Sequence, residues 1–122
     1  MTGDEGTGAS ILVVADDEQI AELMRDFLEA EGFRVRHAAS GRETSEQLEQ
    51  GRPDLVLLDV MLPDESGFEI CRRLRRDSTV PVLFLSARDS DADKIRGLGL
   101  GGDDYIVKSA TPAEVVARVK AV

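Results

Sequence analysis

Residues 53–63 read PDLVLLDVMLP. Within this stretch, apolar residues fill positions 55–58 and an acidic residue, Asp59, follows them directly. An apolar run without polar alternation is typical of a strand that is covered on both faces, as in parallel sheets. We therefore predict a buried strand over residues 54–58, with Asp59 at its carboxyl end.

The same pattern recurs on both sides of this strand. Short apolar runs predict three more strands, at residues 11–14, 82–85 and 105–107, and we predict another at residues 33–38. Apolar spacing and terminal residues predict five helices, at residues 18–31, 41–50, 66–74, 89–98 and 111–122. Strands that alternate with helices indicate an α/β fold: a doubly wound, five-stranded parallel sheet with helices on both faces.

Residues at the ends of the predicted helices support these limits. Ser66 and Thr111 each precede a helix as N-caps, and Pro112 fits the first helical position. Gly32 and Gly51 each follow a helix as stop signals.

The composition is that of one folded domain after a short tail. The chain has 122 residues, of which 42% are hydrophobic and 32% charged, enough for a single core. Residues 1–10 are rich in Gly, Thr and acidic residues, so we predict a disordered tail there and one domain over residues 11–122.

The charge and the cysteine content limit the function. A net charge of -9 argues against nucleic-acid binding by this chain, because neutralising phosphates requires a basic face. The single cysteine, Cys71, excludes an internal disulfide and favours a reducing cytoplasm. No apolar run has the length needed to span a bilayer, so we expect no membrane insertion.

Side chains of complementary chemistry follow the predicted strands. Asp16 and Asp17 follow the first strand, Asp59 the third, Ser86 the fourth and Lys108 the fifth. In parallel sheets, ligands bind outside the carboxyl ends of the strands. Crowded carboxylates favour a hard cation such as Mg²⁺, whereas a hydroxyl and an ammonium group suit an anion. Together these groups predict phosphoryl transfer to an aspartate.

Four stretches resemble the receiver domain of bacterial two-component response regulators, in the family's order over nearly everything after the tail. They are ILVVADDEQI (11–20), PDLVLLDVMLPDESGFEICRRLR (53–75), VPVLFLSARD (80–89) and GGDDYIVKSATPAEVVARVKAV (101–122). The resemblance implies a flavodoxin-like fold and makes Asp59 the phosphoacceptor. A phosphohistidine on a sensor histidine kinase would supply the phosphoryl group. The resemblance implies a signalling domain rather than an enzyme, with at most self-phosphorylation from phosphodonors and slow autodephosphorylation.

The resemblance also implies roles for the residues around Asp59. Mg²⁺ would be bound by Asp16, Asp59 and the backbone carbonyl of Met61, with Asp17 as a possible additional ligand. The phosphate-binding and switch residues would be Ser86, Lys108 and Tyr105. Phosphorylation adds about -1.5 to -2 charge, which the hydroxyl and the ammonium group are placed to bind. Tyr105 would turn inward as Ser86 moves toward the phosphate.

The best likeness is to regulators that are winged-helix transcription factors. These dimerise on phosphorylation through the surface formed by the predicted helix 89–98, the strand 105–107 and the final helix. The matching charged residues here are Lys94, Asp103, Asp104, Glu114 and Arg118. We expect a homodimer through this surface, and DNA contact only through an effector domain that would follow residue 122 in a longer protein.

Two positions depart from the family's pattern. The family has two adjacent acidic residues after the first strand, but position 15 holds Ala15, so we predict weakened Mg²⁺ binding. The family has a cis Lys-Pro bond after the last strand, but here Ser109 follows Lys108. A cis bond without proline costs about 2.5–4 kcal/mol, yet we favour cis because it would position the lysine.

Two other functions fit parts of this sequence. Ala15 and Ser109 favour a receiver that no longer depends on phosphorylation and acts as a constitutive interaction module. An enzyme with an aspartyl-phosphate intermediate, such as a small phosphatase, would need a separate acid/base carboxylate, and Asp64 is nearby in the sequence. Such an enzyme would also need a cap over its substrate, for which 122 residues leave no room.

Overall fold

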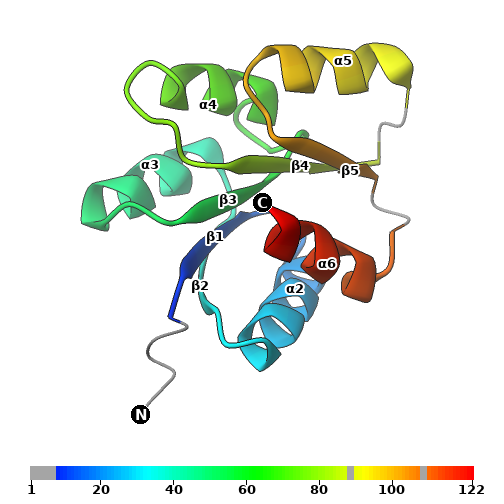
Figure 1. The fold of residues 1–122 in the computed structure, drawn as a ribbon. Helices are drawn as coiled ribbons and strands as arrows, with labels where there is room; N and C mark the ends of the chain where they lie inside the picture. Colours follow the sequence, from blue (N-terminus) through cyan, green and yellow to red (C-terminus); the bar gives the residue numbers. More distant parts are fainter. Residues whose placement is uncertain (1–7, 88–89, 108–109) are drawn as a thin grey trace.

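The computed structural model describes residues 8–87, 90–107 and 110–122. Across these residues, five strands form one parallel sheet in the order β2-β1-β3-β4-β5 (Figure 1). The strands are β1 (Ser10–Val14), β2 (Arg34–Ala38), β3 (Leu55–Asp59), β4 (Val82–Ser86) and β5 (Asp104–Val107). The helices are α2 (Glu18–Ala30), α3 (Gly41–Gln50), α4 (Gly67–Leu74), α5 (Asp91–Gly99) and α6 (Pro112–Ala121). The predicted flavodoxin-like fold is confirmed.

The helices cover both faces of the sheet, as the unbroken apolar strands require. Helices α2 and α6 lie on one face, and α3, α4 and α5 lie on the other (Figure 1). In β3, Leu57 belongs to the core under α2 and α6, whereas its neighbour Leu58 belongs to the core under α4. Because successive side chains of a strand point to opposite faces, a strand in the middle of this sheet needs apolar residues at every position.

The predicted limits of the elements differ from the observed ones by one or two residues. β3 ends at Asp59 itself, and the final helix ends at Ala121. β1 begins at Ser10, so it overlaps the predicted tail by one residue. The Gly8 carbonyl accepts a hydrogen bond of 2.6 Å from Arg34 Nε, which links the segment before β1 to β2. Residues 1–7 of the predicted tail lie outside the described residues.

The predicted helix caps are present. Ser66 Oγ accepts the Phe68 N–H at 3.1 Å, and Thr111 Oγ1 accepts the Glu114 N–H at 3.2 Å. Gly32 follows α2 with a φ of 95°, a left-handed conformation that disfavours other residues. Among the residues that the structure describes, no helix combines the length and the apolarity needed to cross a membrane.

The apolar positions of α2 divide between the core and the surface. Met24 and Leu28 are buried, whereas Leu23 and Phe27 are 42% and 41% exposed. Residues four apart share one side of a helix, and a step of one residue turns the side chain by about 100°. Only part of the predicted apolar stripe therefore faces the sheet.

A buried leucine and an exposed leucine provide a matched test of which residues form the core. We expect Leu57→Ala to lower the free energy of unfolding by about 2–5 kcal/mol, because it leaves a cavity at a residue that is 1% exposed. The same substitution at the exposed Leu23 should cost under about 1 kcal/mol. Urea unfolding followed by circular dichroism measures both values. Equal losses for the two variants would contradict this assignment of the core.

Candidate functional site

The carboxyl ends of the central strands form one edge of the sheet, where the order of the strands reverses. The chain runs from β1 outward to β2 and then returns to β3 on the other side of β1. Such a switch point opens a crevice at the carboxyl ends of the two central strands. Asp59 is the last residue of β3, and Asp16 lies two residues after β1. The predicted acidic residues therefore stand at the crevice.

Asp59 is a carboxylate at the end of an apolar strand. Its residue is 1% exposed, and it pairs with Leu85 in the register of β3 and β4. Its Oδ1 accepts the Met61 N–H at 3.2 Å. A buried carboxylate requires compensating partners, so its neighbourhood must supply donors or a cation.

The loop from Val60 to Ser66 leaves Asp59 and closes on itself. Met61 and Ser66 form an isolated antiparallel bridge, and the Gly67 N–H donates to the Val60 carbonyl at 2.7 Å. The start of α4 is thereby held against the end of β3. A Cβ at Gly67 would lie 2.2 Å from the Asp59 carbonyl oxygen, so only glycine allows this approach.

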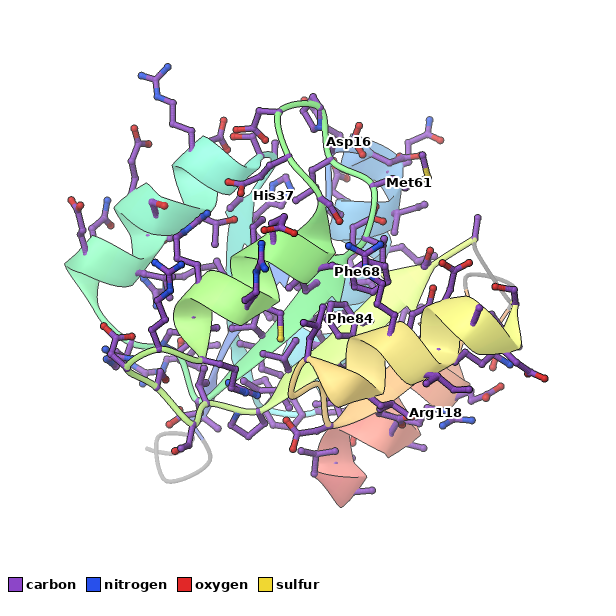
Figure 2. The ribbon with its side chains drawn as sticks, turned by 90° about the horizontal axis from the view of Figure 1, so that it is seen from above. Asp16, His37, Met61, Phe68, Phe84 and Arg118 are labelled. Atoms are coloured by element: carbon purple, nitrogen blue, oxygen red, sulfur yellow. The ribbon has the colours of Figure 1, made fainter. Side chains whose placement is uncertain are left out.

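The segment after β1 is fixed through both polar backbone groups of Ala15. The Ala15 N–H donates to the Ala38 carbonyl at 3.0 Å, and the Ala15 carbonyl lies 2.7 Å from His37 Nε2. Because a carbonyl only accepts, His37 Nε2 is the donor in this contact. Asp16, His37 and Met61 lie toward the same end of the molecule (Figure 2). His37 is half-buried and holds the residue before Asp16.

Asp16 and Asp17 have different surroundings. Asp17 is the N-cap of α2, where its Oδ1 accepts the N–H groups of Gln19 at 2.9 Å and Ile20 at 3.2 Å. Asp16 is exposed beside the crevice. Asp17 is thus directed along α2, which reduces its availability as the additional metal ligand that the sequence suggested.

The predicted phosphate-binding and switch residues lie along β4 and β5. Ser86 ends β4 and is fully buried, and its register partner in β5 is Val107. Tyr105 is 7% exposed and packs against Phe84, with ring centroids 6.0 Å apart. Lys108, Ser109 and the predicted cis bond between them lie outside the described residues.

The donor groups at the crevice fit Mg²⁺. Two carboxylates and a backbone carbonyl are oxygen donors only, which a small hard cation prefers, and Mg²⁺ usually keeps several waters. Over the described ranges, with gaps at 1–7, 88–89 and 108–109, no group of three or more His, Cys, Asp or Glu side chains is arranged to hold a metal.

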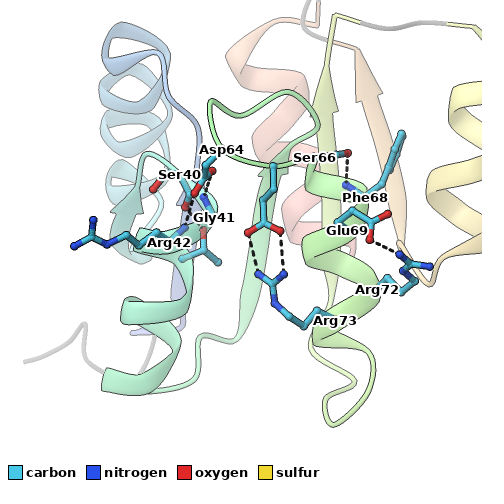
Figure 3. Close-up of polar contacts among 11 residues, drawn as sticks. Ser40, Gly41, Arg42, Asp64, Ser66, Phe68, Glu69, Arg72 and Arg73 are labelled. Carbon is cyan, nitrogen blue, oxygen red and sulfur yellow. Dashed lines mark hydrogen bonds and ion pairs between the residues drawn. The ribbon is translucent and has the colours of Figure 1, made fainter.

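The sequence interpretation missed the role of Asp64. Its Oδ1 accepts the Gly41 N–H at 2.8 Å and its Oδ2 accepts the Arg42 N–H at 3.0 Å (Figure 3). These two N–H groups lower the pKa of the Asp64 carboxyl below its ordinary value, so the carboxylate stabilises the fold above that ordinary pKa and loses this effect as the pH falls. A proton-donating role for Asp64, as in the phosphatase hypothesis, is disfavoured because both oxygens already accept hydrogen bonds. Only the helix start at Gly41 could have suggested this contact from sequence.

The fold and the edge of the sheet define a doubly wound α/β domain of the kind whose site lies at the strand ends. The chain belongs to the response regulator receiver domain family, whose model matches residues 11–120. Receiver domains of this family serve two-component signal transduction, and they generally bind Mg²⁺ at the phosphorylation site.

Individual relatives and solved structures agree with this assignment. The chain is 47% identical over 113 residues to the alkaline phosphatase synthesis transcriptional regulatory protein PhoP of Bacillus subtilis, covering 92% of this chain and 47% of PhoP. It is 46% identical over 110 residues to the transcriptional regulatory protein YcbL of the same organism, covering 90% of this chain and 49% of YcbL. The BeF3-activated receiver domain of Klebsiella pneumoniae RstA superposes with a TM-score of 0.87 at 36% identity, covering 92% of this chain and 96% of that one. The chain spans about half the length of the curated relatives it matches.

The contact at Gly67 predicts a sensitive backbone position. Gly67→Ala places its Cβ against the backbone of Asp59, so the end of β3 or the start of α4 must move. We expect the free energy of unfolding to fall by about 1–3 kcal/mol, as for other overpacked sites. Gly99→Ala is the matched control, because nothing lies within 4 Å of the Cβ that it adds. Thermal unfolding measures both variants, and equal midpoints would show that the approach at Gly67 is not restrictive.

Proposed function

We propose that Asp59 of this receiver domain accepts a phosphoryl group from a phosphohistidine of a sensor histidine kinase. A carboxylate oxygen of Asp59 attacks the phosphorus atom, the bond from phosphorus to the histidine nitrogen breaks, and the imidazole leaves. The observation that carries this proposal is the burial of Asp59 at the end of β3, beside the β4 strand that ends in the buried Ser86.

Phosphorylation of Asp59 would add negative charge at a buried position. The added charge of about -1.5 to -2 requires donors. We assign the Ser86 hydroxyl and the Lys108 ammonium group to the phosphoryl oxygens. Ser86 and Tyr105 lie on adjacent strands, so movement of Ser86 toward the phosphate would alter the space beside Phe84 and Tyr105. Tyr105 would transmit that change to the surface of β5.

Mg²⁺ is the cofactor of this proposal. Held by Asp16, Asp59 and the Met61 carbonyl, it would neutralise charge on the transferring phosphoryl group. Ala15 supplies no carboxylate, and Asp17 already caps α2. We therefore propose that the affinity for Mg²⁺ is low.

An acidic residue introduced at position 15 tests whether Ala15 lowers the affinity for Mg²⁺. We expect Ala15→Asp to raise the affinity for Mg²⁺ about tenfold, because ligand charge governs affinity for hard cations. Isothermal titration at neutral pH measures it, with Asp17→Asn as the control that should change the affinity little. An unchanged affinity in Ala15→Asp, or a large loss in Asp17→Asn, would show that Asp17 already supplies the second carboxylate.

The output of the switch is proposed to be a homodimer through α5, β5 and α6. Arg118 on α6 pairs with Asp104 on β5 at 3.0 Å and with Glu114 at 3.2 Å. On α5, Leu98 lies beside both Lys94 and Ile95, which are four and three residues before it. The side chains of Ile95 and Leu98 are 70% and 47% exposed. Exposed apolar side chains beside charged ones fit an interface with an apolar centre and a polar rim.

The charged residues of this surface are not equally free to change partners. Exposed pairs are worth about 0–1 kcal/mol, so Arg118 can exchange an internal partner for one in a second copy at little cost. Asp103 is more constrained, since its Oδ2 accepts the Val82 N–H at 2.8 Å and lies 3.3 Å from Arg75 Nη2. We propose that dimerisation controls a DNA-binding domain in a longer protein, as the transcriptional regulators among the relatives suggest.

The experiment that tests the function is intact mass after incubation with Mg²⁺ and acetyl phosphate. We expect the wild type to gain one phosphoryl group and Asp59→Asn to gain none. Sedimentation of the same samples should show a larger species only where the phosphoryl group is present.

A second candidate is a module that works without phosphorylation. The observation that favours it is the replacement of an acidic residue by the buried Ala15. A folded wild type that gains no mass at high Mg²⁺ concentration would support this alternative and refute the phosphoacceptor proposal.

A further inference from the structure

The loop that carries Met61 is attached to two helices through carboxylates at its tip. Its base is closed by the Met61–Ser66 bridge and by the hydrogen bond from the Gly67 N–H to the Val60 carbonyl. The tip has no strand or helix of its own, so its position depends on side-chain contacts. Asp64 accepts hydrogen bonds from the start of α3 (Figure 3), and Glu65 accepts hydrogen bonds from Arg73 of α4.

The first attachment is that of Asp64, an exposed residue, to the start of α3. Both carboxylate oxygens accept backbone N–H groups, from Gly41 at 2.8 Å and from Arg42 at 3.0 Å. The first N–H groups of a helix have no partner within the helix and carry partial positive charge, so a carboxylate is their best acceptor. These contacts join residues 23 and 22 positions apart in the sequence.

Helix α3 already has caps from its own residues. Ser40 Oγ accepts the Glu43 N–H at 3.1 Å, and Glu43 Oε1 accepts the Ala39 N–H at 2.8 Å. This pair resembles a capping box, a local device for starting a helix, except that Glu43 accepts the N–H of the residue before the N-cap. The contacts of Asp64 are therefore additional to the helix's own start signal, and they tie the loop to the helix.

The second attachment is the ion pair between Glu65 and Arg73. Glu65 accepts hydrogen bonds from Arg73 Nη1 at 2.9 Å and Nη2 at 3.1 Å. The two side chains are 25% and 46% exposed, so water and salt screen the pair. The Glu65 side chain also occupies the place where a Cβ of residue 41 would lie. Because Gly41 has no Cβ, the tip of the loop can approach α3 closely.

We propose that Asp64 is a positioning residue of the phosphorylation site: its carboxylate holds the loop of Met61 against the start of α3. The inference rests on the proposed function, because Met61 matters only if its carbonyl helps to bind Mg²⁺. A backbone ligand has no side chain through which it can be oriented, so the loop that carries it must be fixed elsewhere. Partners behind metal ligands commonly change metal affinity about 10–100-fold when they are removed.

The test compares three variants of the whole chain. Asp64→Ala removes both hydrogen bonds and the charge, whereas Asp64→Asn removes the charge but keeps one acceptor. Ser40→Ala removes a cap from the same end of α3 without touching the loop. Each variant is checked for folding by circular dichroism, then titrated with Mg²⁺ by calorimetry. Amide hydrogen exchange is measured over residues 60–66.

We expect Asp64→Ala to weaken Mg²⁺ binding about tenfold and to speed exchange over residues 60–66. Asp64→Asn should fall between Asp64→Ala and the wild type, and Ser40→Ala should match the wild type in both measurements. If Asp64→Ala and Ser40→Ala agree, Asp64 is only a helix cap. If Asp64→Asn equals Asp64→Ala in binding while exchange is unchanged, the effect is one of charge, and the inference is wrong.

The phosphorylation assay separates failure of this inference from failure of the proposed function. A wild type that binds no Mg²⁺ and accepts no phosphoryl group overturns both. A wild type that accepts the phosphoryl group on Asp59, with unchanged loop exchange in Asp64→Ala, overturns this inference alone.

Discussion

The structure depends on the burial of β3 on both faces. Leu57 and Leu58 point to opposite cores and are each about 1% exposed or less, so the strand is fixed in the middle of the sheet. Asp59 is the first polar residue after this run, and the register with β1 and β4 sets where it stands. A shift of one residue would draw Asp54 or Asp59 toward the apolar core and is therefore disfavoured. The carboxylate is thus positioned by apolar packing.

The fold and the broad place of the site could be predicted from the sequence because both follow from local patterns. Unbroken apolar runs give a parallel sheet, and the residues after those runs must lie at its carboxyl edge. The N-caps at Ser66 and Thr111 are equally local, because a hydroxyl bonds to an N–H two or three residues ahead. Each of these inferences needs no knowledge of distant contacts.

Contacts between residues distant in the sequence could not be predicted in this way. Asp64 reads as a turn residue, and nothing in its neighbours indicates that it caps α3, more than twenty residues away. Which apolar residues of α2 are buried and which are exposed could not be predicted either. Their spacing indicates a helix, but it does not fix the angle at which the helix meets the sheet. The arrangement of the acidic residues after β1 also depends on which one caps α2, and the structure assigns that role to Asp17.

The loop after Asp59 shows why such a site needs fixed surroundings beyond its ligands. Ordering one residue of backbone costs roughly 1–2 kcal/mol, and a cation that had to order several residues on binding would lose much of its affinity. In our proposal the ordering is largely done before binding, by the Met61–Ser66 bridge at the base and by Asp64 at the tip. With Ala15 in place of one carboxylate, less charge is available to offset any remaining disorder. The fewer ligands a site has, the more its affinity depends on how firmly each one is held.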